Sequence, residues 1–210
     1  MSKAAVIDYD LGNLPSVTKA LQRIRVSTEI VNRGDQIDGR FDAVVLPGVG
    51  HFGAGARNLS DRGFDVALKD WASARKPLLG ICVGLQLFME SSEEEPGAEG
   101  LGIVKGTCRR LRGDGGLKVP HMGWNTLDVK PGSKLFDGFG GPRGRSPRVY
   151  FVHSFYVDPE PSSVAATTTY DETFCSVVEQ DNVVGVQFHP EKSADVGRSV
   201  LEAFFEKVVA

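Results

Sequence analysis

Up to Ser91 the chain alternates between short apolar runs and stretches whose apolar residues recur at helical spacing. The apolar runs predict strands at residues 4–8, 28–31, 43–46 and 77–81. The helical spacing predicts helices at residues 14–24, 64–71 and 85–89. This alternation is typical of a parallel sheet that is covered by helices on both faces and carries its functional loops at the carboxyl ends of the strands.

Beyond Ser92 the pattern changes to shorter apolar pieces separated by turn residues, which predicts a smaller antiparallel β region. The strands expected there are residues 102–104, 118–125, 126–129, 149–157, 165–169, 175–179 and 183–188. Asp181 and Asn182 are expected to turn the last two into a hairpin, and a helix at 196–208 to close the chain. We expect one α/β domain over residues 1–210, because one hydrophobic core can serve this length.

Residues 138–147 are rich in glycine, proline and arginine and predict an exposed loop. Arg143, Arg145 and the adjoining Arg148 could contact a partner. A solvated loop is the simpler interpretation, since connecting segments generally run over the surface.

Charge and cysteine content argue against several classes of function. The net charge is −3 and there is no basic tract, whereas nucleic-acid-binding domains usually carry a basic face. No apolar run approaches the ~18 residues of a membrane span, and the N-terminus lacks the features of a signal peptide. Cys82, Cys108 and Cys175 are far apart and have no partner at ligand spacing, so they predict neither a disulfide nor a metal site and fit a reducing cytoplasm.

The stretch Gly80-Ile81-Cys82-Val83-Gly84 follows an apolar run and precedes a helical pattern. This is the arrangement of a nucleophile elbow, with Cys82 in place of the more familiar serine. The glycines leave room for a tight turn and for a substrate. The alternative is a buried core cysteine, which is where free cysteines usually lie.

The loop from Gly48 to Gly53 has the form Gly-x-Gly-x-x-Gly after a strand, which matches a dinucleotide fingerprint, with Asp70 near the offset of the ribose acid. Asp70 lies inside a helical pattern, whereas a dinucleotide site requires an acid at the end of a strand. We therefore favour a loop that supplies backbone N–H groups to a reaction centre on the same sheet edge as Cys82.

A cysteine nucleophile needs a base and a group that orients the base. His189 is the best candidate of the four histidines because it ends a predicted strand and Glu191 follows two residues later. Pro190 stiffens the link between them, so Glu191 could hold the imidazole in one tautomer. Taken singly, a histidine or glutamate in such a position is more often structural than catalytic.

The elbow at 80–86 and the stretch Phe188-His189-Pro190-Glu191 resemble the class I (triad) glutamine amidotransferases. Further stretches resemble one branch of that class, the glutaminase subunits of imidazole glycerol phosphate synthase in histidine biosynthesis. They are residues 8–17, 47–53, 120–125, 152–155 and 189–193. The similarity runs nearly end to end and implies a flavodoxin-like glutaminase fold that uses no cofactor.

The resemblance implies a Cys82, His189 and Glu191 triad that releases ammonia from glutamine through a glutamyl thioester. The N–H of Val83 would hold the oxyanion together with an N–H of the glycine loop, at Val49 after a peptide flip that its neighbours permit. The loop residues implied in this role are Val49 and Gly50, and those implied in glutamine binding are Gly48, Gln86, Glu94, Ser154 and Phe155.

The resemblance also implies a partner, a separate (β/α)8 cyclase subunit that would receive the ammonia through a tunnel and form imidazole glycerol phosphate and an aminoimidazole carboxamide ribotide. The residues expected on the docking face are Asn13, His121, Trp124 and Lys192, and Trp124 could equally belong to the core.

Three rival functions remain at this point. The same chemistry could serve another synthase, although the 121–125 and Lys192-Ser193 motifs argue against it. The chain could also be a flavodoxin-like binding module that has kept the elbow without activity. Finally, it could be a cysteine-dependent hydrolase of another amide or ester.

Overall fold

The computed structural model describes residues 1–137 and 146–209. The helices are α1 Leu14–Arg23, α2 Phe52–Asp61, α3 Phe64–Ser73, α4 Val83–Gln86 and α5 Ala194–Lys207, with 3₁₀ turns η1 Gly34–Gln36, η2 Pro161–Ser163 and η3 Pro190–Lys192. The strands are β1 Lys3–Ile7, β2 Ser27–Val31, β3 Ala43–Gly48, β4 Leu78–Cys82, β5 Ser91–Ser92, β6 Gly106–Arg110, β7 His121–Thr126, β8 Asp128–Val129, β9 Arg148–His153, β10 Phe155–Pro159, β11 Val164–Tyr170, β12 Glu172–Gln180 and β13 Val183–Val186.

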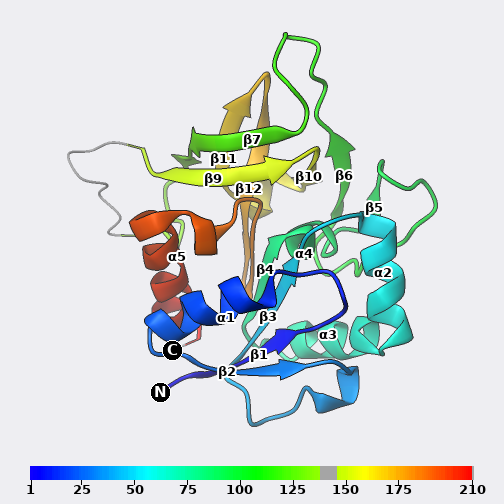
Figure 1. The fold of residues 1–210 in the computed structure, drawn as a ribbon, viewed down its shortest axis with the longest axis vertical. Helices are drawn as coiled ribbons and strands as arrows, with labels where there is room; N and C mark the ends of the chain where they lie inside the picture. The colour runs from blue at the N-terminus through cyan, green and yellow to red at the C-terminus, as the bar shows by residue number, and fades with distance from the viewer. Residues whose placement is uncertain (138–145, 210) are drawn as a thin grey trace.

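One mixed sheet organises the described residues. Its parallel half runs in the order β2-β1-β3-β4-β13, and the path continues through β12, β10 and β6 to β5. The pairings β13–β12, β12–β10 and β10–β6 are antiparallel, and β11 branches from β12 and pairs in turn with β8. A separate two-stranded antiparallel sheet, β7–β9, lies in the upper part of the view in Figure 1. The expected α/β architecture with a smaller antiparallel region is confirmed.

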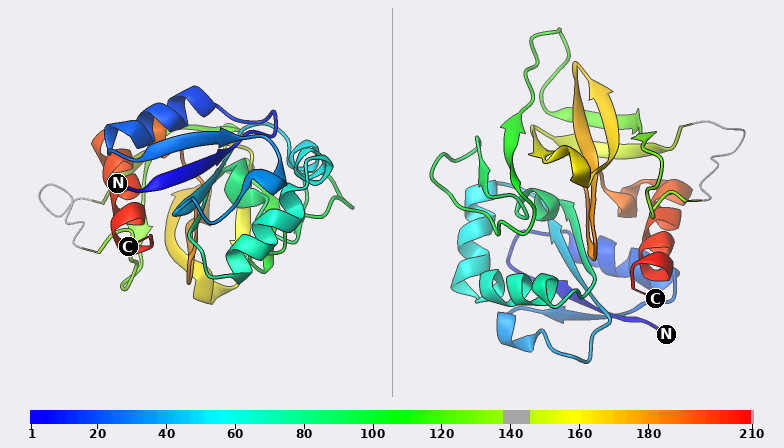
Figure 2. Two further views of the ribbon diagram at one scale, coloured as in Figure 1. Left: turned by 90° about the horizontal axis from the view of Figure 1, so that it is seen from below. Right: turned by 180° about the vertical axis from the view of Figure 1, so that it is seen from behind.

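Helices cover both faces of the parallel strands. Figure 2 shows α1 and α3 on opposite sides of the β1 and β2 ribbons, and α5 beside α1. The strands β1, β3 and β4 are buried along nearly their whole length, which explains why their sequences are continuous apolar runs. Their side chains join those of the helices in one hydrophobic core.

Several local expectations are wrong. The helix α2 was not expected, and the helix after the elbow is a single turn that ends at Gln86. Residues 102–104 form no strand; the strand begins at Gly106 instead. The run 149–157 is two strands that separate at Ser154, where the chain leaves the β7–β9 pair and enters the main sheet. Of the expected loop at 138–147, residues 138–145 with Arg143 and Arg145 lie outside the described part, whereas Arg148 begins β9.

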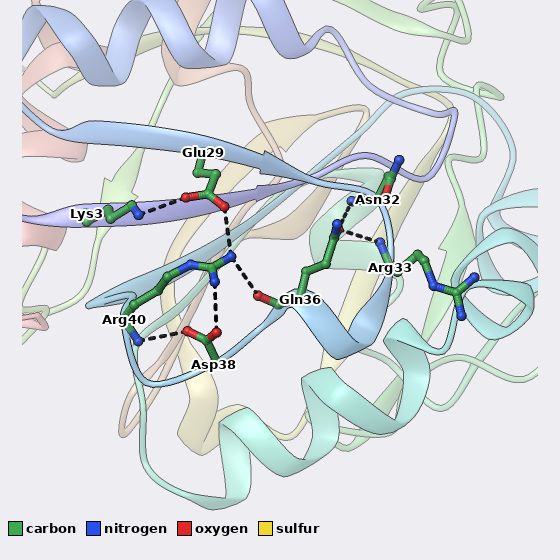
Figure 3. A network of polar contacts seen from close by, with 7 residues as sticks. All are labelled: Lys3, Glu29, Asn32, Arg33, Gln36, Asp38 and Arg40. Carbon is green, nitrogen blue, oxygen red and sulfur yellow. Dashed lines mark hydrogen bonds and ion pairs between the residues drawn. The ribbon is translucent and has the colours of Figure 1, made fainter.

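Charged side chains line the exposed edge at β2 (Figure 3). Glu29 accepts from Lys3 Nζ at 2.8 Å and from Arg40 Nη2 at 2.8 Å, and Arg40 also pairs with Asp38 at 3.0 Å. Exposed ion pairs contribute little to stability. Charges on an edge strand do, however, discourage pairing with strands of other molecules.

The helices of the described residues are all too short or too polar to cross a membrane.

Candidate active site

Cys82 lies at the sharp turn between β4 and the one-turn helix α4. Its backbone φ is +54°, in a left-handed region that is strained for a residue with a Cβ. A Cβ on Gly80 would lie 2.6 Å from the nearest side-chain atom, and one on Gly84 would lie 1.9 Å from the carbonyl oxygen of Leu46. The strand, turn and helix of a nucleophile elbow are therefore present, and both glycines are needed to build them.

Parallel pairing brings three strand ends to one edge of the sheet. Gly48 at the end of β3 lies opposite Cys82, and on the other side of β4 Val186 of β13 lies opposite Ile81. His189 comes shortly after β13 and so reaches the same edge. The prediction that the glycine loop and Cys82 share an edge is confirmed. Asp70 lies within α3 rather than at a strand end, which removes the basis for a dinucleotide site.

His189 is held in a fixed orientation by its neighbours. Its Nδ1 lies 2.9 Å from Glu191 Oε1, and both side chains are only 2% exposed. Its backbone N–H donates to the carbonyl of Tyr150 at 2.9 Å, and its carbonyl accepts from Ser193 Oγ at 2.6 Å. The other ring nitrogen, Nε2, is buried without a hydrogen-bond partner. This arrangement leaves Nε2 free to exchange a proton with a nucleophile or a leaving group.

The electrostatics of the pair follow from its burial and its partners. Burial lowers the pKa of His189, but the neighbouring Cys82 and Glu191 raise it by more, to about 9. The Cys82 sulfur has two weak polar neighbours, the carbonyl oxygen of Val152 at 3.9 Å and Nε2 of Gln187 at 3.8 Å. The raised pKa favours the protonated form of His189, which can supply a proton to a leaving group.

The raised pKa of His189 predicts how stability changes with pH. The folded-state pKa is about 9, and that of an unfolded histidine is about 6.5, so the folded protein binds more protons between these values. We expect the free energy of unfolding to fall by about 1 kcal/mol between pH 7 and 8, as measured by urea denaturation. Glu191→Gln should weaken this dependence. A wild-type stability that stays constant or rises over this interval would contradict the assignment.

The other perturbed groups in the core contribute little between pH 7 and 8. Burial lowers the pKa of His121 to about 4 and that of His153 to about 3, so both add stability as pH rises through the unfolded value of about 6.5, and this gain is nearly complete by pH 7. Burial raises the pKa of the Cys108 and Cys175 thiols. Their contribution is lost as pH rises through the unfolded thiol pKa of about 8.5. Between pH 7 and 8 the small remaining gain from the two histidines and the small loss from the two thiols have opposite signs, so the change in stability there reports chiefly on His189.

A cavity of about 330 Å³ opens beside Cys82. Its walls come from the glycine loop, the elbow, the segment at Glu94, the residue before β7, the end of β9 and the start of β10. The lining residues are Val49, Gly50, Cys82, Val83, Gln86, Glu94, Pro120, Val152, His153, Ser154, Phe155 and His189. Among the described residues, no group of three or more His, Cys, Asp or Glu side chains could hold a metal ion.

Polar groups on the cavity wall are held in place by hydrogen bonds. Gln86 Nε2 donates to the carbonyl of Phe155 at 2.9 Å, and Glu94 Oε2 accepts from the N–H of Phe52 at 2.7 Å. Of the three consecutive glutamates, Glu94 lines the cavity, whereas Glu95 pairs with Arg57 on the surface. The cavity wall thus offers a carboxylate and an amide whose positions are held by backbone groups.

The remaining predicted residues lie in different surroundings. Gly48 is buried and does not line the cavity. Asn13 and Lys192 are exposed, and Trp124 is 48% exposed and therefore no core residue. His121, expected on the docking face, is 2% exposed and hydrogen-bonds His153 at 3.0 Å. Its side chain is thus enclosed by the protein and contacts no outer surface.

Two polar residues of the site were not predicted. His153 lines the cavity and contacts the carbonyl of Phe155 through Nδ1 at 2.9 Å. Gln187 is fully buried and bridges Gln86 to the Cys82 sulfur. The sequence held one sign of both residues, a polar side chain at the apolar end of a predicted strand. Such a residue, once buried, needs a specific partner.

Comparisons with known proteins agree with this geometry. The family model of class I glutamine amidotransferases matches residues 5–208. The chain is similar to imidazole glycerol phosphate synthase subunit HisH of Trichodesmium erythraeum (strain IMS101), with 45% identity over 100% of this chain and 96% of the relative. The HisH subunit of Listeria innocua serovar 6a is 41% identical over 96% of this chain and 94% of the relative. Among solved structures, a glutamine amidotransferase matches with a TM-score of 0.74 and 17% identity, over 96% of this chain and 97% of that one. PurLQS from Thermotoga maritima matches with a TM-score of 0.74 and 19% identity, over 98% of each chain.

Proposed function

The chain belongs to the class I glutamine amidotransferases and, within them, to the HisH subunits of imidazole glycerol phosphate synthase, and on that premise we propose that it releases ammonia from glutamine with a Cys82, His189 and Glu191 triad for a (β/α)8 cyclase partner. The observation that carries the triad is the meeting of these residues at one sheet edge, with His189 buried between Glu191 and the cavity that Cys82 lines. Glutamine is the substrate and ammonia the product that leaves for the partner.

The first step is attack by the Cys82 thiolate on the side-chain amide carbon of glutamine. The new C–S bond pushes the carbonyl electron pair onto oxygen, which gives a tetrahedral intermediate. The N–H of Val83, the first residue of α4, needs no partner within the helix and is therefore available to donate to this oxygen. An N–H of the loop at Val49 and Gly50 supplies the second hydrogen bond after a peptide flip.

The second step expels ammonia. His189 gives its Nε2 proton to the leaving nitrogen as the C–N bond breaks, which leaves a glutamyl thioester on Cys82 and a neutral imidazole. The same nitrogen then takes a proton from water, the hydroxide adds to the thioester, and glutamate departs as the thiolate is restored. Glu191 holds Nδ1 throughout, so Nε2 always faces the reacting atoms.

The amino-acid end of glutamine binds on the opposite wall of the cavity. The carboxylate of Glu94 is placed to accept the α-ammonium, and Gln86 with the backbone of Ser154 and Phe155 completes the contacts. Gly48 acts indirectly, by allowing the loop to approach the elbow. These positions restrict the substrate to an amide that carries a free amino-acid group.

The partner is proposed to dock at the same sheet edge, over the exposed Asn13, Trp124 and Lys192. A (β/α)8 cyclase seated there would cover the cavity mouth and receive ammonia before it meets bulk water. The buried His121 would affect this surface only through its neighbours on β7.

Titration with a purified cyclase subunit and its ribotide substrate tests both parts of the proposal. We expect the rate of glutamate release to rise with the concentration of cyclase. Removal of a central aromatic residue typically costs an interface ~2 kcal/mol, so Trp124→Ala should need about 30-fold more cyclase for half-maximal stimulation. Val66, 61% exposed on α3, provides the control: Val66→Ala should titrate like the wild type. A rate of glutamate release that stays the same at every cyclase concentration would refute the proposed partner.

A further inference from the structure

Tyr9 carries a hydroxyl that is buried and has no hydrogen-bond partner, and its side chain is only 1% exposed. Most buried polar groups are paired, so an unpaired one calls for an explanation. The proposed chemistry explains the unpaired Nε2 of His189. The unpaired hydroxyls of Thr168 and Ser176 belong to β11 and β12 and do not line the cavity. Tyr9 is different because its hydroxyl lies against Gly48 of the glycine loop and has no role in the reaction steps.

The hydroxyl lies directly under the first residue of the glycine loop. It is 2.5 Å from the point where a Cβ of Gly48 would stand, and the backbone nitrogen of Gly84 is 2.6 Å from the same point. Tyr9 does not line the cavity, so it does not contact glutamine. Burial, and to a lesser extent the nearby Cys82, raises the pKa of Tyr9, so the hydroxyl keeps its proton and is available as a donor.

The loop above this hydroxyl can rotate its peptides. Val49 has a glycine on each side, and Gly50 already adopts a φ of +103°. Rotation of the peptide between Gly48 and Val49 moves its two polar groups in opposite directions. When the Val49 N–H turns toward the cavity, the Gly48 carbonyl turns toward the interior, where it needs a donor.

We infer that the Tyr9 hydroxyl is this donor: it hydrogen-bonds the Gly48 carbonyl when the loop adopts its oxyanion-binding conformation and is unpaired when the loop is at rest. Tyr9 is then a positioning residue, acting on the oxyanion hole through the loop. The inference rests on the proposed glutaminase function and adds a group that selects the active state of the loop. It also accounts for a polar atom that weakens the resting structure.

Tyr9→Phe tests the inference because it removes the hydroxyl and keeps the ring. We expect kcat for glutamine hydrolysis in the complex with the cyclase subunit to fall about 10-fold, while KM changes by less than about 2-fold, since the hydrogen bond exists only in the oxyanion-binding conformation of the loop. The same variant should unfold at a temperature about 2 °C higher than the wild type, because the resting protein loses an unpaired buried group. Lower activity together with higher stability is not the result of a merely structural role.

Two controls separate the possible outcomes. Thr168→Val removes another unpaired buried hydroxyl and should raise the unfolding temperature without changing kcat. Alkylation of Cys82 by iodoacetamide, which needs no oxyanion hole, should proceed equally fast in the wild type and in Tyr9→Phe. An unchanged kcat, a lowered unfolding temperature or a tenfold slower alkylation would each overturn the inference. An inactive wild type or an active Cys82→Ala would instead refute the glutaminase function itself.

Discussion

Replacement of Cys82 by alanine is expected to lower the rate of glutamine hydrolysis by at least ~10⁴-fold, because no other group can form the thioester. The described structure contains two further cysteines, Cys108 and Cys175, and both are buried outside the cavity with raised thiol pKa values. Neither can replace the nucleophile. Glutamate release in the presence of the cyclase subunit and ribotide measures the effect.

The same change at Cys175 provides a matched control. Cys175 lies on β12 with its sulfur 3.4 Å from the carbonyl of Val177, and it makes no contact with the cavity. Cys175→Ala should therefore retain wild-type kcat and KM. If Cys82→Ala still formed glutamate at more than a hundredth of the wild-type rate, covalent catalysis by this residue would be disproved. Both variants should unfold cooperatively, so that loss of activity cannot be attributed to loss of the fold.

The parallel half of the fold could be predicted because local sequence and tertiary position agree there. The strands β1, β3 and β4 are buried on both faces, so their apolar runs report their positions directly. The helix α1 was equally visible, since its apolar residues follow one stripe and Asn13 accepts a hydrogen bond from the Ser16 N–H at its start.

The antiparallel region was harder to predict because distant pairing decides its boundaries. The run 149–157 is one apolar stretch, yet it divides at Ser154 because β9 pairs with β7 and β10 pairs with β6. The strand β6 is half exposed and carries two arginines, so it lacks a strong apolar pattern. The helix α2 contains Gly53 and Gly55, which weaken its helical pattern, and Gly53 also completes the Gly-x-Gly-x-x-Gly pattern of the predicted loop. In each case tertiary contacts override the local preference.

The active site, like the fold, could be predicted only in part. Cys82, His189 and Glu191 stand in short stretches whose chemistry can be recognised locally, and strand order then brings those stretches to one edge. Their supporting contacts are not local. The bond from Gln187 to Cys82 joins residues 105 positions apart, and the His121–His153 bond spans 32. Side chains such as these are found only once the packing is known, because nothing in their own stretch specifies the partner.

The elbow also makes a strong prediction about stability. A Cβ at Gly84 would lie 1.9 Å from the carbonyl oxygen of Leu46 and 2.9 Å from its carbonyl carbon. These are backbone atoms of β3, which is held by parallel pairing to β4 with Leu46 opposite Gly80. Because the strand cannot move aside without breaking the centre of the sheet, Gly84→Ala should destabilise the fold by more than ~4 kcal/mol. The unfolding temperature should then fall by at least about 8 °C, or the protein should fail to fold.

Gly39→Ala supplies the comparison for Gly84→Ala, since nothing lies within 4 Å of the Cβ that it would add. An alanine there limits the unfolded chain and should leave the unfolding temperature unchanged or slightly higher. The difference between the two variants measures how closely α4 is packed on β3, and hence how rigidly the elbow presents Cys82. If Gly84→Ala unfolded within about 2 °C of Gly39→Ala, the elbow would have room that the structure does not give it. The strain at Cys82 would then have to be held by contacts other than this close approach.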